Sequence, residues 1–229
     1  MEPECGNYGA FLPFSSYNPY PPDSKNDKIF LEYSYYAIKT LKLLTDYIDN
    51  GNFSELDFNR IALYSYIFEN IVETTSTLYF DPQYTDDPVE ILRHTYYMIY
   101  ILKELELYDL NNEKIKYLVE ENVDYENIKS LYYCYKISEI LDLNIIFDVD
   151  LTHALIQDIY SESINDFFLT PEREVVDHKA FSWVCEIALN DDVRIDTTYL
   201  SSIILGSTNN ITASLCNMIL NDFGPYTIV

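Results

Sequence analysis

The sequence predicts an all-α fold, and three observations support that prediction. The 229-residue chain contains only 5 glycines and 9 prolines, too few for a fold rich in tight turns. Hydrophobic residues make up 48% of the chain and aromatic residues 16%, as is typical of a protein with a globular core. An aromatic pattern with helical spacing also returns along the chain, beginning at Ser34, Thr95, Leu131 and Lys179. Repetition of this kind indicates stacked helical hairpins.

The distribution of apolar residues predicts an irregular segment followed by one helical domain. Residues 1–29 contain Pro19-Tyr20-Pro21-Pro22, which favours turns and extended chain. Residues 30–229 form the helical domain, with about nine helices placed by their apolar periodicity. We expect these helices at about 31–48, 55–74, 88–107, 112–123, 125–142, 150–162, 171–190, 196–205 and 210–221.

Several of these helices carry local signals at their ends. Asp87-Pro88-Val89-Glu90 offers an N-cap, a proline at the first helical position and an acid at the third, as in a capping box. Thr170-Pro171-Glu172 has a similar pattern and predicts a helix start at residue 171. Asp148 and Asp150 precede an apolar stripe, where they predict an N-cap and an acid near the positive end of the helix. Gly206 predicts a helix stop.

The expected helices fall into two kinds, which indicate an inner and an outer layer. Inner helices are apolar around much of their circumference, and these are 34–44, 95–105, 131–141 and 180–189. Outer helices carry a narrower apolar stripe and more charge, and these are 55–74, 112–123 and 150–162. An arrangement of this kind would curve into an arc or a ring.

The charge of the chain limits its partners. With 38 acidic and 14 basic residues, the formal net charge is -24, which argues against nucleic acid and against an anionic membrane surface. The acids are scattered between apolar positions, as on solvated helix faces, and do not form the continuous runs expected of a nucleic-acid mimic. A partner segment of basic character fits this charge.

Cysteine usage and the absence of apolar runs predict a cytoplasmic protein. The four cysteines include no Cys-x-x-Cys pair, and three of them lie on expected apolar helix faces, where a reduced thiol behaves as a small hydrophobic group. The first residues carry neither the basic nor the apolar region of a signal peptide. Charged residues interrupt every apolar stretch, so we expect no membrane insertion.

Short aromatic strips precede three of the expected inner helices. Gly9-Ala10-Phe11 precedes Tyr35, Leu78-Tyr79-Phe80 precedes Thr95, and Asp166-Phe167-Phe168 precedes Ala180. In this respect the chain resembles the α/α-toroid repeats of the prenyltransferase and terpenoid-cyclase-like superfamily, although it lacks that group's paired glycines and Gln-Trp element. The resemblance implies a toroid. Because nine helices are fewer than a full ring requires, it implies an open arc or a ring completed as a homo- or hetero-oligomer.

Two groups of acids resemble catalytic motifs of that superfamily. The sequence pattern of a diphosphate-binding magnesium motif is matched by Asp86, Asp87 and Glu90. Two of the three acids of a motif that protonates the substrate are supplied by Asp148 and Asp150. Capping of a helix explains both groups as well, because each stands at an expected helix start.

A zinc site is not expected, although zinc occurs in protein prenyltransferases of this fold. The nearest match is Asp177-His178 with Cys185, and the two helical turns between the histidine and the thiol place them too far apart for one ion. We therefore expect neither a metal nor another cofactor.

The repeated aromatic residues are candidates for a ligand-binding surface. They are Tyr35, Tyr36, Tyr96, Tyr97, Tyr132, Tyr133 and Trp183. Such a stripe at helical spacing either lines a central cavity or forms the core, and core residues are the commoner case.

The repeat without a complete catalytic motif favours a non-catalytic binding or protein-interaction module, whose partner is a protein or an apolar small molecule. The alternative is an isoprenoid-processing enzyme, a prenyltransferase or a terpenoid cyclase, with a degenerate acidic site.

Overall fold

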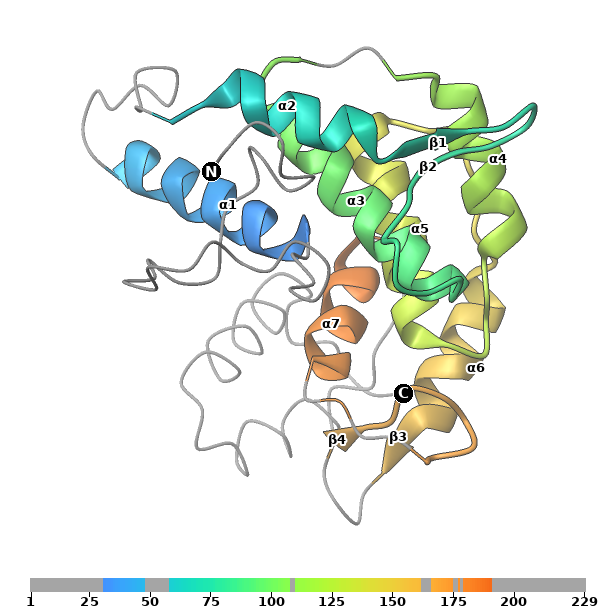
Figure 1. Cartoon of the computed structure of the whole chain (residues 1–229). Helices are drawn as coiled ribbons and strands as arrows, with labels where there is room; N and C mark the ends of the chain where they lie inside the picture. Colours follow the sequence, from blue (N-terminus) through green and yellow to red (C-terminus); the bar gives the residue numbers. More distant parts are fainter. Residues whose placement is uncertain are drawn as a thin grey trace. The chain divides into compact units, whose positions relative to one another are not determined.

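A computed structural model describes residues 31–47, 58–107, 110–161, 166–174, 177 and 179–190 (Figure 1). Its elements are α1 (Leu31–Tyr47), α2 (Arg60–Glu69), β1 (Ile71–Glu73), β2 (Leu78–Phe80), α3 (Pro88–Glu104), α4 (Asn112–Asn122), α5 (Ile128–Leu141), α6 (Val149–Ile159), β3 (Tyr160–Ser161), β4 (Asp166–Phe167) and α7 (Ala180–Asn190). Helices predominate, as predicted. The irregular segment 1–29 and the helices expected at 196–205 and 210–221 lie outside the described residues, and a toroid of nine helices stays a prediction.

The chain divides into two compact units, which we describe separately. The first comprises Met1–Asn122 and Lys136–Leu143, and the second comprises Val123–Tyr135 and Asn144–Val229. The division falls within α5. Whether residues 30–229 behave as one domain stays a prediction.

In the first unit, α3 is the central element. It packs against α1, α4 and β2, and β2 also packs against α4. Side chains from these elements and from α2 form a fully buried apolar core, including Leu31, Ile38, Leu63, Ile67, Leu92, Met98, Ile99 and Ile115. At roughly 25 cal/mol per Å², burial of such side chains is the main contribution to the stability of the unit.

The helix expected at 55–74 is shorter than predicted, because a β-hairpin replaces its end (Figure 1). Asn59 caps α2, and its side chain accepts a hydrogen bond from Ala62 N at 2.9 Å. The helix ends at Glu69, and the side-chain amide of the C-cap residue Asn70 donates to Tyr66 O at 2.7 Å. The β-branched residues that follow favour strands β1 and β2, and the Thr74 hydroxyl accepts from the backbone N–H of Thr77 at 2.8 Å in the turn.

The N-cap and the proline at the start of α3 are the ones that the sequence predicts, but the reciprocal bond of a capping box, from Asp87 N to the Glu90 side chain, does not form. Asp87 is the N-cap and accepts from Val89 N at 3.0 Å, and Pro88 occupies the first turn. The backbone N–H of Asp87 donates to the Thr85 hydroxyl at 3.0 Å. The carboxylate of Glu90, at the third helical position, forms an ion pair with Arg93.

The second unit places α7 later than expected. Instead of a helix beginning at Pro171, residues 170–173 form a turn, in which Arg173 has a positive φ of 59°. The Arg173 guanidinium donates to the backbone oxygens of Asp158, at 3.0 and 3.2 Å, and Tyr160, at 3.2 Å. These contacts stabilise the turn, and the helix begins at Ala180.

The expected helix at 150–162 ends at Ile159, where strand β3 begins. Strand β3 pairs with β4 in antiparallel register, Tyr160 opposite Phe167. The Phe167 side chain is fully buried and lies 6.0 Å from the Phe181 ring of α7. Two of the aromatic strips therefore form the second strands of β-hairpins, namely β2 and β4. Each hairpin lies in the sequence between a helix predicted as outer and a helix predicted as inner.

Helices α3 and α5 share the aromatic sequence pattern that repeats after roughly 36 residues, and their C-terminal ends have the same structure as well. After α3, Glu106 has φ 56° and Leu107 N donates to Leu102 O at 3.1 Å. After α5, Asp142 has φ 52° and Leu143 N donates to Ser138 O at 2.9 Å. Both ends are Schellman motifs with an acidic residue where glycine is usual. The helices that follow, α4 and α6, have 11 residues each.

The first testable prediction concerns these two acidic residues. Glu106→Gly should raise the free energy of unfolding by about 1 kcal/mol, because glycine adopts the left-handed conformation without a Cβ penalty. Urea denaturation followed by circular dichroism measures the change. Glu106→Ala is the control: it removes the same charge but retains Cβ, so a gain as large as that of glycine would contradict the explanation.

Burial follows the predicted alternation between inner and outer helices for most elements. Helices α3, α5 and α7 are buried on more than one side, whereas α4 and α6 bury a single stripe. Helix α1 differs from the expected inner helix, because Tyr36, Leu43 and Leu44 are exposed on it.

Candidate functional site

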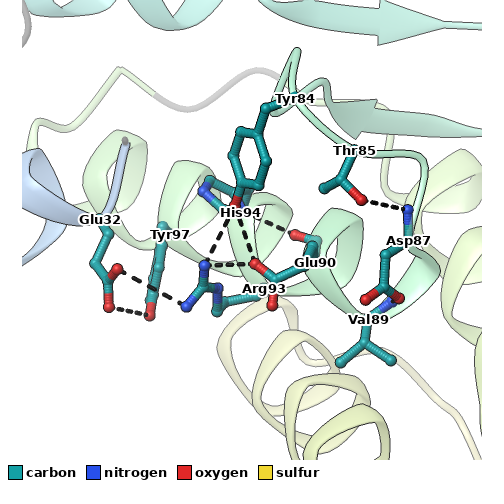
Figure 2. Close-up of polar contacts among 9 residues, drawn as sticks. All are labelled: Glu32, Tyr84, Thr85, Asp87, Val89, Glu90, Arg93, His94 and Tyr97. Carbon is teal, nitrogen blue, oxygen red and sulfur yellow. Dashed lines mark hydrogen bonds and ion pairs between the residues drawn. The ribbon is translucent and has the colours of Figure 1, made fainter. Parts of the chain in front are cut away.

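A largely buried polar cluster lies at the start of α3, where hydrogen bonds and ion pairs join several ionisable side chains (Figure 2). Four of its members lie on α3 with the spacing of one helical face, and these are Glu90, Arg93, His94 and Tyr97. The others come from α1, which supplies Glu32, and from the segment between β2 and α3, which supplies Tyr84. All six residues belong to the first unit.

Arg93 is the centre of the cluster. Its guanidinium forms ion pairs with Glu90 and, at 3.8 Å, with Glu32, and it donates to the Tyr84 hydroxyl at 3.3 Å. The exposed fractions of the three charged side chains are 16% for Arg93, 16% for Glu90 and 21% for Glu32. Burial acts to lower the pKa of Arg93 and is the largest single effect, but Glu90, Tyr97, Glu32 and Tyr84 together more than offset it, so the pKa is raised. Arg93 therefore stays charged.

Two tyrosine hydroxyls complete the contacts of the carboxylates. Tyr84 donates to Glu90 Oε2 at 3.0 Å, and Tyr97 donates to Glu32 Oε1 at 3.5 Å. Burial, together with the Glu90 carboxylate, raises the pKa of Tyr84, so the hydroxyl remains a donor at neutral pH. The cluster thereby connects α1, α3 and the segment before α3.

His94 is the most deeply buried ionisable group of the cluster, with 1% of its surface exposed. Its Nδ1 lies 2.8 Å from the backbone oxygen of Glu90, and its Nε2 has no hydrogen-bond partner in the described chain. Burial lowers the pKa of His94, and the neighbouring Arg93 acts in the same direction. A neutral imidazole at this depth cannot reach a substrate in solvent, so the arrangement favours a structural role over general acid–base catalysis.

The acids that resemble catalytic motifs have different structural roles. Asp86 and Asp87 are exposed, with Asp87 capping α3, while Glu90 pairs with Arg93. In the second unit, Asp148 caps α6 by accepting from Leu151 N at 3.0 Å, and Asp150 is exposed. The capping interpretation of Asp87 and Asp148 is confirmed. A catalytic role for any of these acids stays untested.

No metal site emerges from the described residues, among which no group of three or more His, Cys, Asp or Glu side chains could hold an ion. His178, the histidine of the sequence that comes nearest to a zinc motif, lies outside the described residues. Cys134 and Cys185 are buried, and burial raises the pKa of the Cys134 thiol to about 12. Because a protonated thiol is a poor nucleophile and a poor ligand, Cys134 behaves as a core side chain.

In the first unit the predicted ligand-binding tyrosines pack against one another. The Tyr35 ring stacks on Tyr97 with centroids 4.3 Å apart, and its hydroxyl lies 3.5 Å from that of Tyr96. Tyr36 is exposed on one side and contacts Tyr35 at 5.1 Å. Tyr35, Tyr96 and Tyr97 are buried. Such mutual packing is the behaviour of core side chains.

The second unit contains an analogous aromatic group. Trp183 of α7 stacks on Tyr132 of α5 at 5.7 Å and lies 6.3 Å from Tyr133. All three side chains are buried, and the Tyr132 hydroxyl donates to Glu186 at 3.2 Å. The structure therefore brings together the predicted aromatic residues within each unit.

Sequence analysis did not identify the cluster around Arg93. The spacing of Glu90, Arg93, His94 and Tyr97, at intervals of three and four residues, was the available signal for their common face. Glu32 and Tyr84 carry no such signal, because they approach through tertiary contacts.

The fold and the cluster define a mostly helical protein with buried aromatic and ionic interactions. Comparisons of the chain with protein-family models, with curated proteins and with solved structures gave no match. Within the described part of the chain, no helix has the length and apolarity needed to cross a membrane.

Proposed function

We propose that the chain is a non-catalytic protein-interaction module whose helix α2 binds a basic, amphipathic helix of a partner protein. One observation carries this proposal: α2 exposes an apolar stripe formed by Ile61, Tyr64 and Phe68. Ile61 is 79% exposed and Phe68 60%, and the half-buried Tyr64 ring stacks on Phe68 at 5.6 Å.

The opposite face of α2 is already used within the first unit, where Ala62, Leu63, Tyr66 and Ile67 are buried. A helix that is apolar on two faces is normally buried on both. Exposing the second face leaves apolar surface in water, and binding a partner would remove it. Spacings of three, four and seven residues suit the interdigitation of two helices.

The charge of the chain supports a basic partner. A net charge of -24 attracts lysine- and arginine-rich segments and repels acidic ones. A protein partner is preferred over an apolar small molecule, because Tyr35, Tyr97, Tyr132 and Trp183 are occupied by contacts with other rings. A toroid or open arc, suggested by the family resemblance, belongs to the same proposal and would present α2 on its outer layer.

The second testable prediction uses a synthetic amphipathic helix of leucine and lysine, about five turns long, as the probe. Ile61→Asp with Phe68→Asp should weaken its binding at least tenfold in a fluorescence-anisotropy titration, because both substitutions remove apolar contact. The design separates two causes. Each aspartate makes the protein more acidic, so binding by charge alone would become stronger.

Two controls complete this test. Ile146→Asp changes an apolar side chain of the second unit that is 93% exposed, and it should leave the affinity within twofold. Circular dichroism should show both variants folded, since exposed substitutions seldom destabilise. Unchanged or tighter binding by the α2 double variant would refute the proposal.

A further inference from the structure

The surroundings of His94 combine deep burial with an unsatisfied polar atom. Its ring stacks on Phe80 of β2, with centroids 6.3 Å apart and planes 17° apart. Tyr84 and Tyr97 meet the ring edge-on, at 5.7 and 5.9 Å. The aromatic contacts exclude water from a side chain that can carry a charge.

The hydrogen bond of His94 assigns its tautomer. Because a backbone carbonyl only accepts, the contact between Nδ1 and Glu90 O requires a proton on Nδ1. Nε2 then carries a lone pair and has no partner in the described chain. Adding a proton to Nε2 would create a buried donor without an acceptor, which is destabilising.

Burial lowers the pKa of His94 overall, and the charged groups around the imidazole act in both directions, because Arg93 lowers that pKa whereas Glu90 and Glu32 raise it. On α3 they are Arg93 and Glu90, and on α1 the facing group is Glu32. Both carboxylates already form ion pairs with Arg93, and the guanidinium is adjacent in sequence to the imidazole. The segment before α3 contributes only the Tyr84 hydroxyl, whose hydrogen bond goes to Glu90. Glu32 and Glu90 carry two negative charges against the single positive charge of Arg93, so the cost of protonating His94 comes from its burial and from the missing acceptor for Nε2, and not from a shortage of negative charge.

We propose that His94 makes the contact between α3 and residues 78–87 a pH-sensitive switch, closed when the imidazole is neutral and opened when it is protonated. Opening separates Phe80 and Tyr84 from the histidine and breaks the hydrogen bond from Phe80 N to the Thr95 hydroxyl, which measures 3.1 Å. It also loosens the contacts of Tyr84 with Glu90 and Arg93.

The sign of the effect follows from linkage. Burial lowers the pKa of His94 in the closed form, and exposure returns it to about 6.5 in the open form. The open form thus binds more protons, so the neutral imidazole favours the closed form above the open-form pKa of about 6.5, and this contribution is lost as the pH falls below it. Between pH 7.5 and pH 5.5, one such histidine changes the closing equilibrium by at most about tenfold, the limit reached when the imidazole stays neutral in the closed form throughout this range.

The third testable prediction is measured by hydrogen–deuterium exchange of the purified full chain, with rates corrected for the intrinsic effect of pH. Protection of peptides covering residues 78–97 should fall by up to about tenfold between pH 7.5 and pH 5.5. In His94→Asn and His94→Phe the fall should disappear: asparagine keeps a donor for Glu90 O, phenylalanine keeps the stacked ring, and neither titrates.

His153→Asn is the matched control. His153 lies on α6, partly exposed, and its hydrogen bond to Gln157 is local, so this variant should keep the wild-type response. Equal pH dependence in wild type and in both His94 variants would overturn the proposal. If neither His94 variant folds, the imidazole carbon resonances of the wild-type protein decide. Titration of His94 at or above pH 6.5 would overturn the proposal. Titration below pH 6.5, together with a loss of amide-exchange protection in residues 78–97 as the pH falls, would support it.

Discussion

Replacing Arg93 by methionine is expected to lower the free energy of unfolding by about 3 to 5 kcal/mol. The substitution retains most of the apolar stem but leaves Glu32 and Glu90 largely buried without their counter-charge. The cost therefore arises from two uncompensated carboxylates and not from lost packing. Urea denaturation followed by circular dichroism measures it.

An exposed ion pair provides the comparison for Arg93. Lys116→Met breaks the pair between Lys116 and Glu120 on α4, at 3.8 Å, and should cost only about 0.5 kcal/mol, since solvent screens these charges. Combining Arg93→Met with Glu32→Gln and Glu90→Gln should restore part of the stability, because neutral amides replace the unpaired charges. Equal costs for Arg93→Met and Lys116→Met would show that the cluster contributes nothing beyond a surface pair.

Trp183→Ala is expected to lower the free energy of unfolding by about 3 to 5 kcal/mol. The indole is 5% exposed and packs on Tyr132 and Tyr133, so alanine would leave a large cavity in the second unit. Trp183→Phe retains a ring and should cost about half as much. Because Trp183 is the single tryptophan, circular dichroism rather than fluorescence follows unfolding.

The same experiment separates the two interpretations of the aromatic residues. Truncating a side chain that lines an open ligand cavity lowers the stability of the protein little, whereas truncating a core side chain lowers it much. Tyr117→Ala is the control. Because Tyr117 is 43% exposed on α4, this substitution should lower the free energy of unfolding by less than about 0.5 kcal/mol. A cost for Trp183→Ala as small as that of the control would favour the ligand-binding interpretation.

Local chemistry explains why many helices could be predicted. The start of α3 depends on Asp87 and Pro88, and the start of α6 depends on Asp148, all within one turn of the helix that they begin. The ends of α3 and α5 could not be read in this way. Glu106 and Asp142 adopt a conformation for which glycine is the usual signal, so only their backbone angles revealed the shared motif.

The late start of α7 depends on residues distant in sequence. Thr170 and Pro171 have the local chemistry of a helix start, and a turn forms there because Arg173 reaches the carbonyls of Asp158 and Tyr160. Likewise, strand β2 is held by the Thr95 hydroxyl of α3, which accepts from Phe80 N. Propensities act over a few residues and contain no information about such partners.

In the candidate cluster, too, part of the arrangement follows from the local sequence and part from the tertiary structure. Amino-acid spacing alone assigns Glu90, Arg93, His94 and Tyr97 to one face of a helix, because α-helical periodicity is a local property. The tertiary structure brings Glu32 and Tyr84 to that face and buries it. Burial turns these six side chains into a charged network around Arg93 and a neutral histidine, because the free energy of a charge depends on the groups and the solvent around it in the folded protein.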